Sequence, residues 1–313
     1  SNNERGSLLD LKEDIPIIIV PDIHSRPDFI LNILDYELPF DFLKNKTKIC
    51  DVGEFENQKN LPQKMKIGNL LEKELVYLVC VGDAIHSELT PKRWASIEDE
   101  FYSGIYDGPV MQEEMIAGFA VLCGIMELKR AFPKNFHFLK GNHENILNSS
   151  ENGDYAFKKY ADEGEMVKKF VQTVYGDDIL YLISYFEANL PLVVKGKKCV
   201  ISHAEPALEL SKKDIINARL NPSIVESLIW TKNDTVFDNT VEKNLVNLLG
   251  KRKAKKALYF AGHRPIKNNF ALRQEGKFVQ LHNPKKQNVA LVSSIVDFDL
   301  ENDIVSVDLS GGK

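Results

Sequence analysis

The sequence predicts an α/β protein, because short apolar runs of strand type alternate along the chain with stretches of helical periodicity. LVCV at residues 78–81 is apolar and β-branched, as fully buried strands are. It stops at Gly82 and is followed at once by Asp83. The same layout, an apolar strand that ends in possible metal ligands, recurs four more times. Because α/β sheets carry their sites at the carboxyl ends of strands, these ends predict the functional site.

The first strand signal is IPIIIV at residues 15–20, and a helix of period 3.6 is expected over residues 30–40. Asp22 and His24 lie in the loop between them, two positions apart, so both side chains point the same way on an extended segment. Taken alone, they also fit a helix cap and a surface histidine. Residues 1–14 are interpreted as an N-terminal tail or tag remnant, and residues 15–313 as a single domain.

Two excursions are expected, at residues 44–74 and 88–108. The first is polar, lysine-rich and weakly periodic, with room for a small hairpin. The second is irregular and aromatic, and its aromatic side chains either line a substrate cleft or pin the loop to the core. Pro109 then opens a helix whose apolar residues recur at helical spacing.

The second half of the chain repeats the strand layout. Residues 136–139 form a strand before the sequence GNHE, and a helical wall is expected at about 150–185, with a helix over 154–175. LPLVV and KCVISH read as strands joined by a hairpin turn at residues 195–197, and ALYFAGH as a further strand. The tail after residue 288 reads as a closing pair of strands.

Composition limits the partners more than the chemistry. The 313 residues are 43% hydrophobic and 27% charged, which suits one large domain or two ordinary ones. The net charge of −5 disfavours a broad polyanion-binding surface, so nucleic acid is not expected. No apolar run approaches the roughly 18 residues of a membrane span, and no secretory signal is recognised. Four widely separated cysteines disfavour structural zinc and disulfides and favour a cytoplasmic protein.

The strand ends together supply a ligand set of carboxylate, amide oxygen and imidazole without thiolate: Asp22, His24, Asp83, Asn142, His143, His203 and His263. Such a set suits Mn, Fe, Zn or Mg. Seven residues are too many for one ion with an open position, and they suit two ions about 3.5–4 Å apart. Two dications near two carboxylates leave a positive pocket, as an anionic phosphate ester requires.

The chain carries five motifs in order: D-x-H (22–24), G-D (82–83), G-N-H-E (141–144), H (203) and G-H (262–263). In this order they resemble the motifs of the calcineurin-like metallophosphoesterases, and the resemblance covers about residues 15–300. LPL before His203, LIW after it and a single histidine in GHRP make the resemblance closest to the phosphoprotein-phosphatase branch, which includes diadenosine tetraphosphatases. The resemblance implies a four-layer α/β/β/α sandwich of two mixed sheets flanked by helices.

The resemblance also implies the role of each residue. Asp22 and His24 would hold the first metal, and Asp83 would bridge both metals. Asn142, His203 and His263 would complete the ligands of the second metal. His143 would be the general acid that protonates the leaving alkoxide while a hydroxide bridging the metals attacks phosphorus. Glu144 and Asp28 are candidates to orient neighbouring groups.

The chain departs from the branch at one motif. The branch typically reads G-D-x-x-D-R-G, where the second Asp supports the catalytic histidine and the Arg binds phosphate, but this chain has His86 and Ser87 at those positions. Three residues are candidate phosphate ligands instead, Arg26, His86 and Arg264. Each also fits a purely structural role.

The favoured function is a phosphatase that uses two divalent metal ions, with Mn²⁺ as the favoured metal, and acts on phosphomonoesters in the manner of serine/threonine phosphatases. The substrate would be a phosphoprotein or a small phosphoester. The alternatives are a dinucleoside polyphosphate or nucleotide phosphohydrolase, with Trp94, Tyr102 or Tyr106 as an adenine slot, and a phosphodiesterase. An inactive metal-binding scaffold and a nuclease are remoter alternatives.

Overall fold

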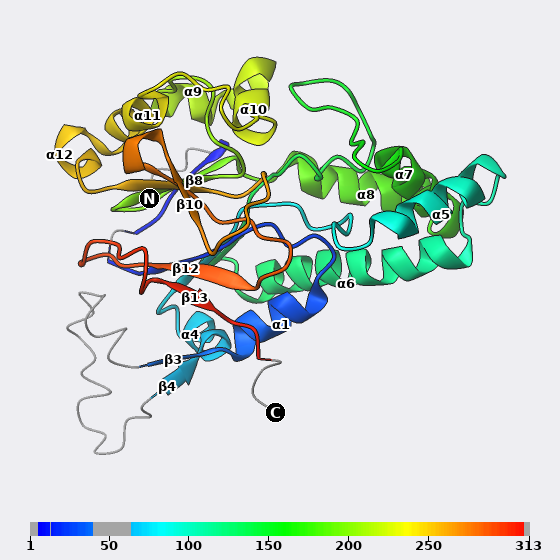
Figure 1. Ribbon diagram of the computed structural model, residues 1–313, viewed down its shortest axis with the longest axis horizontal. Helices are drawn as coiled ribbons and strands as arrows, with labels where there is room; N and C mark the ends of the chain where they lie inside the picture. Colours follow the sequence, from blue (N-terminus) through cyan, green and yellow to red (C-terminus); the bar gives the residue numbers. More distant parts are fainter. Residues whose placement is uncertain (1–5, 13, 40–63, 310–313) are drawn as a thin grey trace.

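The computed structural model describes residues 6–12, 14–39 and 64–309, and two mixed sheets lie at its centre (Figure 1). The five-stranded sheet has the order β13-β12-β2-β5-β6, with bounds Ile304–Ser306, Asn288–Val292, Ile17–Val20, Tyr77–Cys80 and Phe136–Phe138. The six-stranded sheet has the order β1-β7-β8-β9-β11-β10, with bounds Leu8–Asp10, Val193–Lys195, Cys199–Ser202, Leu258–Ala261, Phe278–Gln280 and Ala271–Arg273. A small antiparallel pair joins β3 (Glu37–Pro39) to β4 (Lys64–Lys66).

The two sheets pack face to face because successive side chains of each strand point to opposite sides. In β2, Ile17 and Ile19 pack in the cluster between the sheets, whereas Ile18 and Val20 pack against helices. Phe260 of β9 likewise lies between the sheets, and its neighbour Tyr259 packs outward. Continuous apolar strands are therefore required, since both faces of each sheet are covered.

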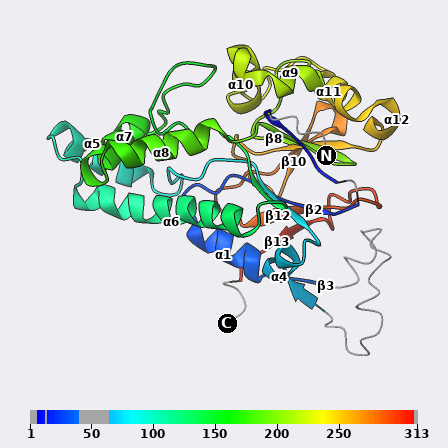
Figure 2. The ribbon, with the colours of Figure 1, turned by 180° about the vertical axis from the view of Figure 1, so that it is seen from behind.

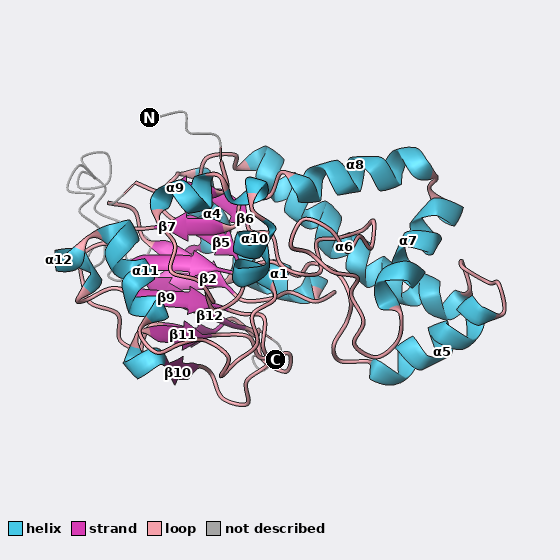
Figure 3. Ribbon diagram, turned by 90° about the horizontal axis from the view of Figure 1, so that it is seen from above, coloured by secondary structure: helices cyan, strands magenta, loops and turns pink. Residues whose placement is uncertain are grey.

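Helices cover the two outer faces. Six helices share one apolar cluster with the five-stranded sheet: α1 (Pro27–Asp35), α4 (Ile67–Glu72), α5 (Pro91–Tyr102), α6 (Pro109–Ala131), α7 (Glu163–Val174) and α8 (Asp177–Ala188). The six-stranded sheet packs against α9 (Lys212–Ile216), α10 (Pro222–Ile229), α11 (Thr240–Leu249) and α12 (Lys251–Ala254). Figures 1 and 2 show these outer layers from opposite sides, and Figure 3 shows α5–α8 extending to one side of the sheets. The four-layer sandwich is confirmed.

Most elements lie where the sequence predicts them. The hairpin of β7 and β8, the helix that begins at Pro109 and the closing pair of β12 and β13 are all present. The helical wall is made by α7 and α8, although residues 154–162 are loop and not the start of a helix. Residues 44–63 of the first excursion lie outside the described residues.

Three further expectations are wrong. The helix expected up to residue 40 ends at Asp35 as α1, and residues 37–39 form the strand β3. The excursion at 88–108 contains α5, because Trp94 and Ile97 are buried in the core and anchor it as a helix. Residues 8–10, assigned to the tail, form the edge strand β1 parallel to β7. Local sequence hides this strand because its stability comes from pairing with residues 193–195, far along the chain.

One described helix, α6, is long and apolar enough to cross a membrane by length and composition alone. Its apolar residues serve the core instead, since Met111, Met115, Val121, Leu122 and Ile125 are buried. The helix also contacts α1, α5 and β6. We therefore interpret α6 as a core helix of the sandwich.

Candidate metal centre

Six strands end at one place, three from each sheet. The strands β2, β5 and β6 are parallel, as are β8, β9 and β11, so their carboxyl ends meet at one edge of the sandwich. Each is followed within a few residues by a polar side chain that is at most 9% exposed: Asp22, Asp83, Asn142, His203, His263 and His282. His24 and His143 lie in the same loops, so every sequence-predicted metal ligand and His143 come together here.

The loops that carry these side chains are strained. His24, Asp83 and His263 have φ of 46°, 56° and 63°, a left-handed conformation that is uncommon outside glycine. Such strain costs of order 1–3 kcal/mol per residue and persists only where the surrounding structure fixes it. Three strained residues around one point indicate a functional site.

The glycines of the motifs are required because a carboxylate oxygen lies where a side chain would begin. A Cβ atom on Gly141 would lie 2.2 Å from Asp83 Oδ1, and one on Gly262 would lie 2.5 Å from Asp22 Oδ2. Neither distance is physically possible without displacing a carboxylate. The glycines of G-N-H-E and G-H therefore make room for the ligands.

Glu144 fastens two of the loops together. Its carboxylate accepts hydrogen bonds from the backbone N–H groups of Asp83, Ala84 and Gly141 at 2.9, 2.8 and 2.7 Å. Glu144 therefore has the orienting role that the sequence left open between two residues. Asp28 is exposed and accepts a hydrogen bond from Gln287, away from these loops.

Asp83 lies at the middle of the site. Its Oδ2 atom is 3.5 Å from His24 Nε2 and 3.5 Å from His203 Nε2, which come from different sheets. Asn142 Oδ1 lies 2.9 Å from both His203 Nε2 and His263 Nδ1. Asp83, Asn142, His203 and His263 form the second ligand group. The first ligand group contains Asp22 and His24, and it shares Asp83 with the second.

Beside the first ligand group lies a buried histidine, His282, that sequence reasoning missed. Asp22, His24 and His282 offer atoms within 4.8 Å of one another, as do Asp83, His203 and His263. His282 Nδ1 lies 2.9 Å from Asp22 Oδ2, and its Nε2 lies 2.7 Å from Glu88 Oε2. A signal was present, since His282 follows the apolar run of β11 in the layout of the other ligands.

The histidines present lone pairs to the site. His24 Nδ1 faces the carbonyl oxygen of His86 at 3.0 Å, and His203 Nδ1 faces that of Val81 at 3.1 Å. A carbonyl oxygen only accepts, so Nδ1 carries the proton in both rings and Nε2 is left free to ligate. This is how metal-binding histidines are usually held.

The site fits divalent metal ions. Among the described residues, the buried atoms Asp22 Oδ1 and His24 Nε2 make no hydrogen bond, although buried polar atoms nearly always have a partner. Two ions held by Asp22, His24, Asp83, Asn142, His203 and His263 would satisfy both atoms. The donor set of oxygen and imidazole nitrogen matches that of hard-to-borderline dications.

The electrostatics agree with this assignment. Burial lowers the pKa of His24 and of His203 to about 4, so both imidazoles are neutral near pH 7, as ligation requires. Burial raises the pKa of Asp83, and the nearby Asp22 and Glu144 carboxylates raise it further. Burial lowers the pKa of His282, but Asp22 and Glu88 outweigh it and raise the value to about 9. Cations would offset this concentration of carboxylates.

His143 lies beside the shared carboxylate. Its Nε2 is 3.6 Å from Asp83 Oδ2 and its backbone N–H donates to Asp83 Oδ1 at 3.0 Å. Its Nδ1 is 2.8 Å from His86 Nδ1, so His86 contacts His143 directly. Phe157 covers both rings, with its centroid 3.6 Å from that of His143 and 4.9 Å from that of His86.

The three candidate phosphate ligands differ in what they contact. Arg26 is 7% exposed, and all three of its guanidinium nitrogens donate to backbone carbonyls, including those of Ile23, Asp22 and Lys286. That expectation is therefore corrected, because Arg26 is committed to holding its loop. Arg264 is partly exposed, and its buried Nε has no hydrogen-bond partner among the described residues. Of the two arginines, only Arg264 retains a free donor.

The aromatic slot expected from the sequence does not form around Trp94. This side chain is fully buried, and its Nε1–H donates to the Ser87 carbonyl oxygen at 3.1 Å. Tyr102 is 69% exposed and its hydroxyl donates to Asp162. Trp94 is thus a core residue that anchors the loop after β5.

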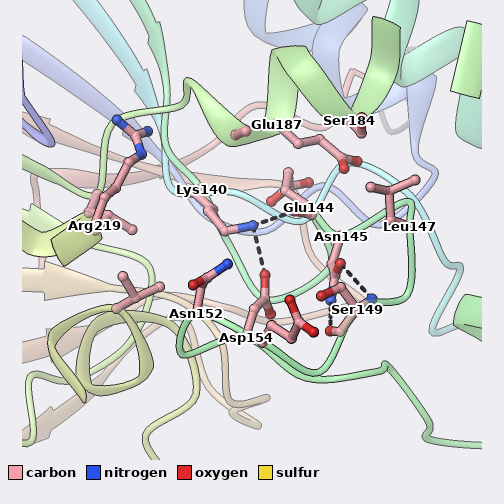
Figure 4. Close-up of a pocket in the computed structure, with 14 residues that line it drawn as sticks. Lys140, Glu144, Asn145, Leu147, Ser149, Asn152, Asp154, Ser184, Glu187 and Arg219 are labelled. Carbon is pink, nitrogen blue, oxygen red and sulfur yellow. Dashed lines mark hydrogen bonds and ion pairs between the residues drawn. The ribbon is translucent and has the colours of Figure 1, made fainter. Parts of the chain in front are cut away.

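A separate cavity of about 330 Å³ lies next to the site (Figure 4). Glu144 and Lys140 border it, and Lys140 bridges to Asp154 at 2.8 Å. Arg219 and Glu187 lie on its other walls. No metal-ligand candidate and no part of His143 lines this cavity, so we do not assign it to the substrate phosphate.

A comparison with protein families shows which family has this site. The family model for calcineurin-like phosphoesterases matches residues 15–286, which is most of the chain and includes every motif. The chain is a calcineurin-like phosphoesterase. This phosphoesterase is therefore a hydrolase of phosphoric esters, and the resemblance inferred from its motifs is confirmed.

A solved structure supports the fold of this phosphoesterase. A protein serine/threonine phosphatase from Saccharomyces cerevisiae with similarity to human phosphatase PP5 superposes with a TM-score of 0.54 at 15% identity, covering 96% of this chain and 83% of that one. A cold-active protein-tyrosine phosphatase of Shewanella gives 0.46 at 12% identity, with coverage of 93% and 79%. A comparison with curated protein sequences finds no match for this phosphoesterase.

Proposed function

We propose that this phosphoesterase is a dimetal-dependent phosphomonoesterase of the serine/threonine phosphatase type, with His143 as the general acid. The observation that carries the proposal is the position of one oxygen. Asp83 Oδ2 lies 3.5–3.6 Å from the Nε2 atoms of His24, His203 and His143. A shared carboxylate and an acid therefore face the same point.

The ligand groups have separate tasks in this proposal. Asp22, His24 and Asp83 would hold one ion, and Asp83, Asn142, His203 and His263 the other. Two divalent ions, for which we propose Mn²⁺, would supply positive charge for the phosphoryl oxygens and activate the attacking water.

His143 would supply a proton to the leaving oxygen from Nε2, the atom that faces Asp83. His86 supports this role because a neutral imidazole either donates or accepts a hydrogen bond. Burial lowers the pKa of His86 to about 3, so the ring is neutral. With its proton on Nδ1, His86 donates to a neutral His143, and in the tautomer with its proton on Nε2, His86 Nδ1 accepts from a protonated His143. The Asp typical of the branch only accepts, so His86 replaces it with a group that suits both states.

Among the described residues, we propose Arg264 and Lys159 as the cations that face the substrate phosphate. Arg264 is partly exposed and directly follows His263, and its Nε has no hydrogen-bond partner among the described residues. A guanidinium suits phosphate oxygens, so we propose Arg264 as a phosphate ligand. Lys159 is 34% exposed and pairs with Glu88 at the rim. Phe157, two residues before Lys159, packs on His143 with ring centroids 3.6 Å apart.

The first experiment is hydrolysis of p-nitrophenyl phosphate beside bis-p-nitrophenyl phosphate by metal-stripped protein reloaded with Mn²⁺. Metal-dependent cleavage that is at least about tenfold faster for the monoester is expected, because one phosphate dianion suits two cations. Preference for the diester would replace the proposal with a phosphodiesterase. Binding of two ions without turnover of either substrate would contradict the proposal and favour a scaffold.

A further inference from the structure

We infer that His282 is a fourth protein ligand of the first metal ion and that Glu88 is the residue that positions it. The inference rests on the proposed function, since it concerns the same dimetal site. It adds two residues to which the family resemblance assigns no role. The first ion would then have four protein ligands, Asp22, His24, Asp83 and His282, as many as the second.

The geometry of His282 is that of a metal-binding histidine whose outer ring nitrogen is held by a carboxylate. The ring is fully buried, at 0% exposure. Its Nδ1 points to Asp22 Oδ2 at 2.9 Å, on the side where Asp22 and His24 already converge. Its Nε2 points the opposite way, to Glu88 Oε2 at 2.7 Å. A carboxylate on the outer nitrogen is the usual way in which a metal-binding histidine is oriented.

Glu88 is itself held in place. Its side chain is 6% exposed, and Lys159 pairs with its other oxygen, Oε1. Oε1 also lies 3.8 Å from His24 Nε2, so Glu88 faces both histidines of the first ligand group. A buried glutamate with two fixed oxygens can aim the His282 ring with little freedom.

The sequence places Glu88 in the motif that departs from the family pattern. In GDAIHSE, His86 contacts His143 and Glu88 contacts His282. Glu88 falls where G-D-x-x-D-R-G has its last glycine, which has no side chain to offer. The changes at this motif and the presence of a histidine after β11 therefore belong to one arrangement.

An added imidazole changes the metal that the first group prefers. Imidazole nitrogen favours ions such as Zn, Cu, Fe and Ni, whereas oxygen ligands favour Mg. With His24 and His282 together, the first group would take a transition-metal dication and bind Mg²⁺ poorly.

The test measures metal binding and needs no enzymatic activity. Stripped wild-type protein and the variants His282→Asn and Glu88→Gln are titrated with Zn²⁺ in a calorimeter, and bound metal is counted after dialysis. His137→Asn is the matched control, because His137 is also buried but contacts Lys134 and Lys129 outside the site. Circular dichroism and thermal melting check that each variant is folded.

Wild type and His137→Asn are expected to bind two ions with equal affinity. His282→Asn should weaken one ion by more than about 100-fold and leave the other, whereas Glu88→Gln should weaken that same ion by about 10–100-fold, the usual effect of an orienting partner. Unchanged affinities in both variants would overturn the inference and make His282 only a cation between two carboxylates.

A second variant keeps the inference testable if His282→Asn does not fold. His282→Cys titrated with Cd²⁺ should gain a sulfur-to-cadmium charge-transfer band in the ultraviolet, and His137→Cys should not. Absence of the band in a folded His282→Cys protein that binds two Cd²⁺ would overturn the inference. Two ions bound by an inactive wild-type protein, with the band present, would instead refute the proposed function and leave this inference standing.

Discussion

Two roles are open to His143, general acid and metal ligand, because its ligand atom lies within 4.8 Å of those of Asp83 and His24. Replacing His143 with Asn separates these two roles. As a general acid it contributes to the transition state alone. Its loss should lower kcat by roughly 10²–10⁴-fold, which corresponds to about 3–5 kcal/mol. The backbone N–H that donates to Asp83 Oδ1 is kept in the variant, so the bridging carboxylate should stay in place.

The assay compares two leaving groups. p-Nitrophenolate leaves readily without a proton, whereas the alkoxide of phosphoserine needs one, so an acid matters more for the second. We expect His143→Asn to lose about 10²-fold on p-nitrophenyl phosphate and approach 10⁴-fold on a phosphoserine peptide. Metal content should stay at two ions per chain, and His137→Asn should match wild type on both substrates.

Two results would refute the reasoning. Release of an ion from folded His143→Asn protein would make His143 a ligand and not an acid. Equal losses on the two leaving groups, with both ions retained, would show that His143 holds the substrate and does not protonate it.

Four further predictions concern other residues. Asp83→Asn should lose metal and turnover together, because it removes the shared charge; an active variant with two ions would contradict this, as measured by metal analysis. His86→Ala should lower kcat by about 10–100-fold with KM nearly unchanged, since His86 contacts His143; a raised KM at constant kcat would instead support phosphate binding. Arg264→Ala should raise KM by about 10–100-fold, the loss of one charged hydrogen bond, while the exposed Arg130→Ala should have no effect. Burial raises the pKa of Glu187 from 4.5 to about 8. The stability that the folded protein gains by holding this proton is therefore present below about pH 4.5 and lost as the pH rises through 8. Glu187→Gln should remove up to about 5 kcal/mol of this pH dependence in denaturant titrations, and an unchanged dependence of the unfolding free energy on pH would refute the prediction.

The sequence by itself determined the strands that carry the site and the chemistry that they carry. Runs such as 17–20 and 77–80 are apolar at every position because both faces of each sheet are covered, and that pattern is local. Asp22, Asp83 and His203 follow such runs directly, so the ligand set could be read in order. Gly141 and Gly262 mark points where no side chain fits beside a carboxylate.

Only the tertiary structure decided which polar residues meet. Arg26 and Arg264 look alike in sequence, yet one donates to backbone carbonyls throughout and the other keeps a free donor. Glu88 and His282 are 194 positions apart and touch because β5 and β11 end at the same edge of the sandwich. A side chain's partners depend on which strand ends the fold brings together, and that pairing is set by contacts between distant segments, which no local pattern contains.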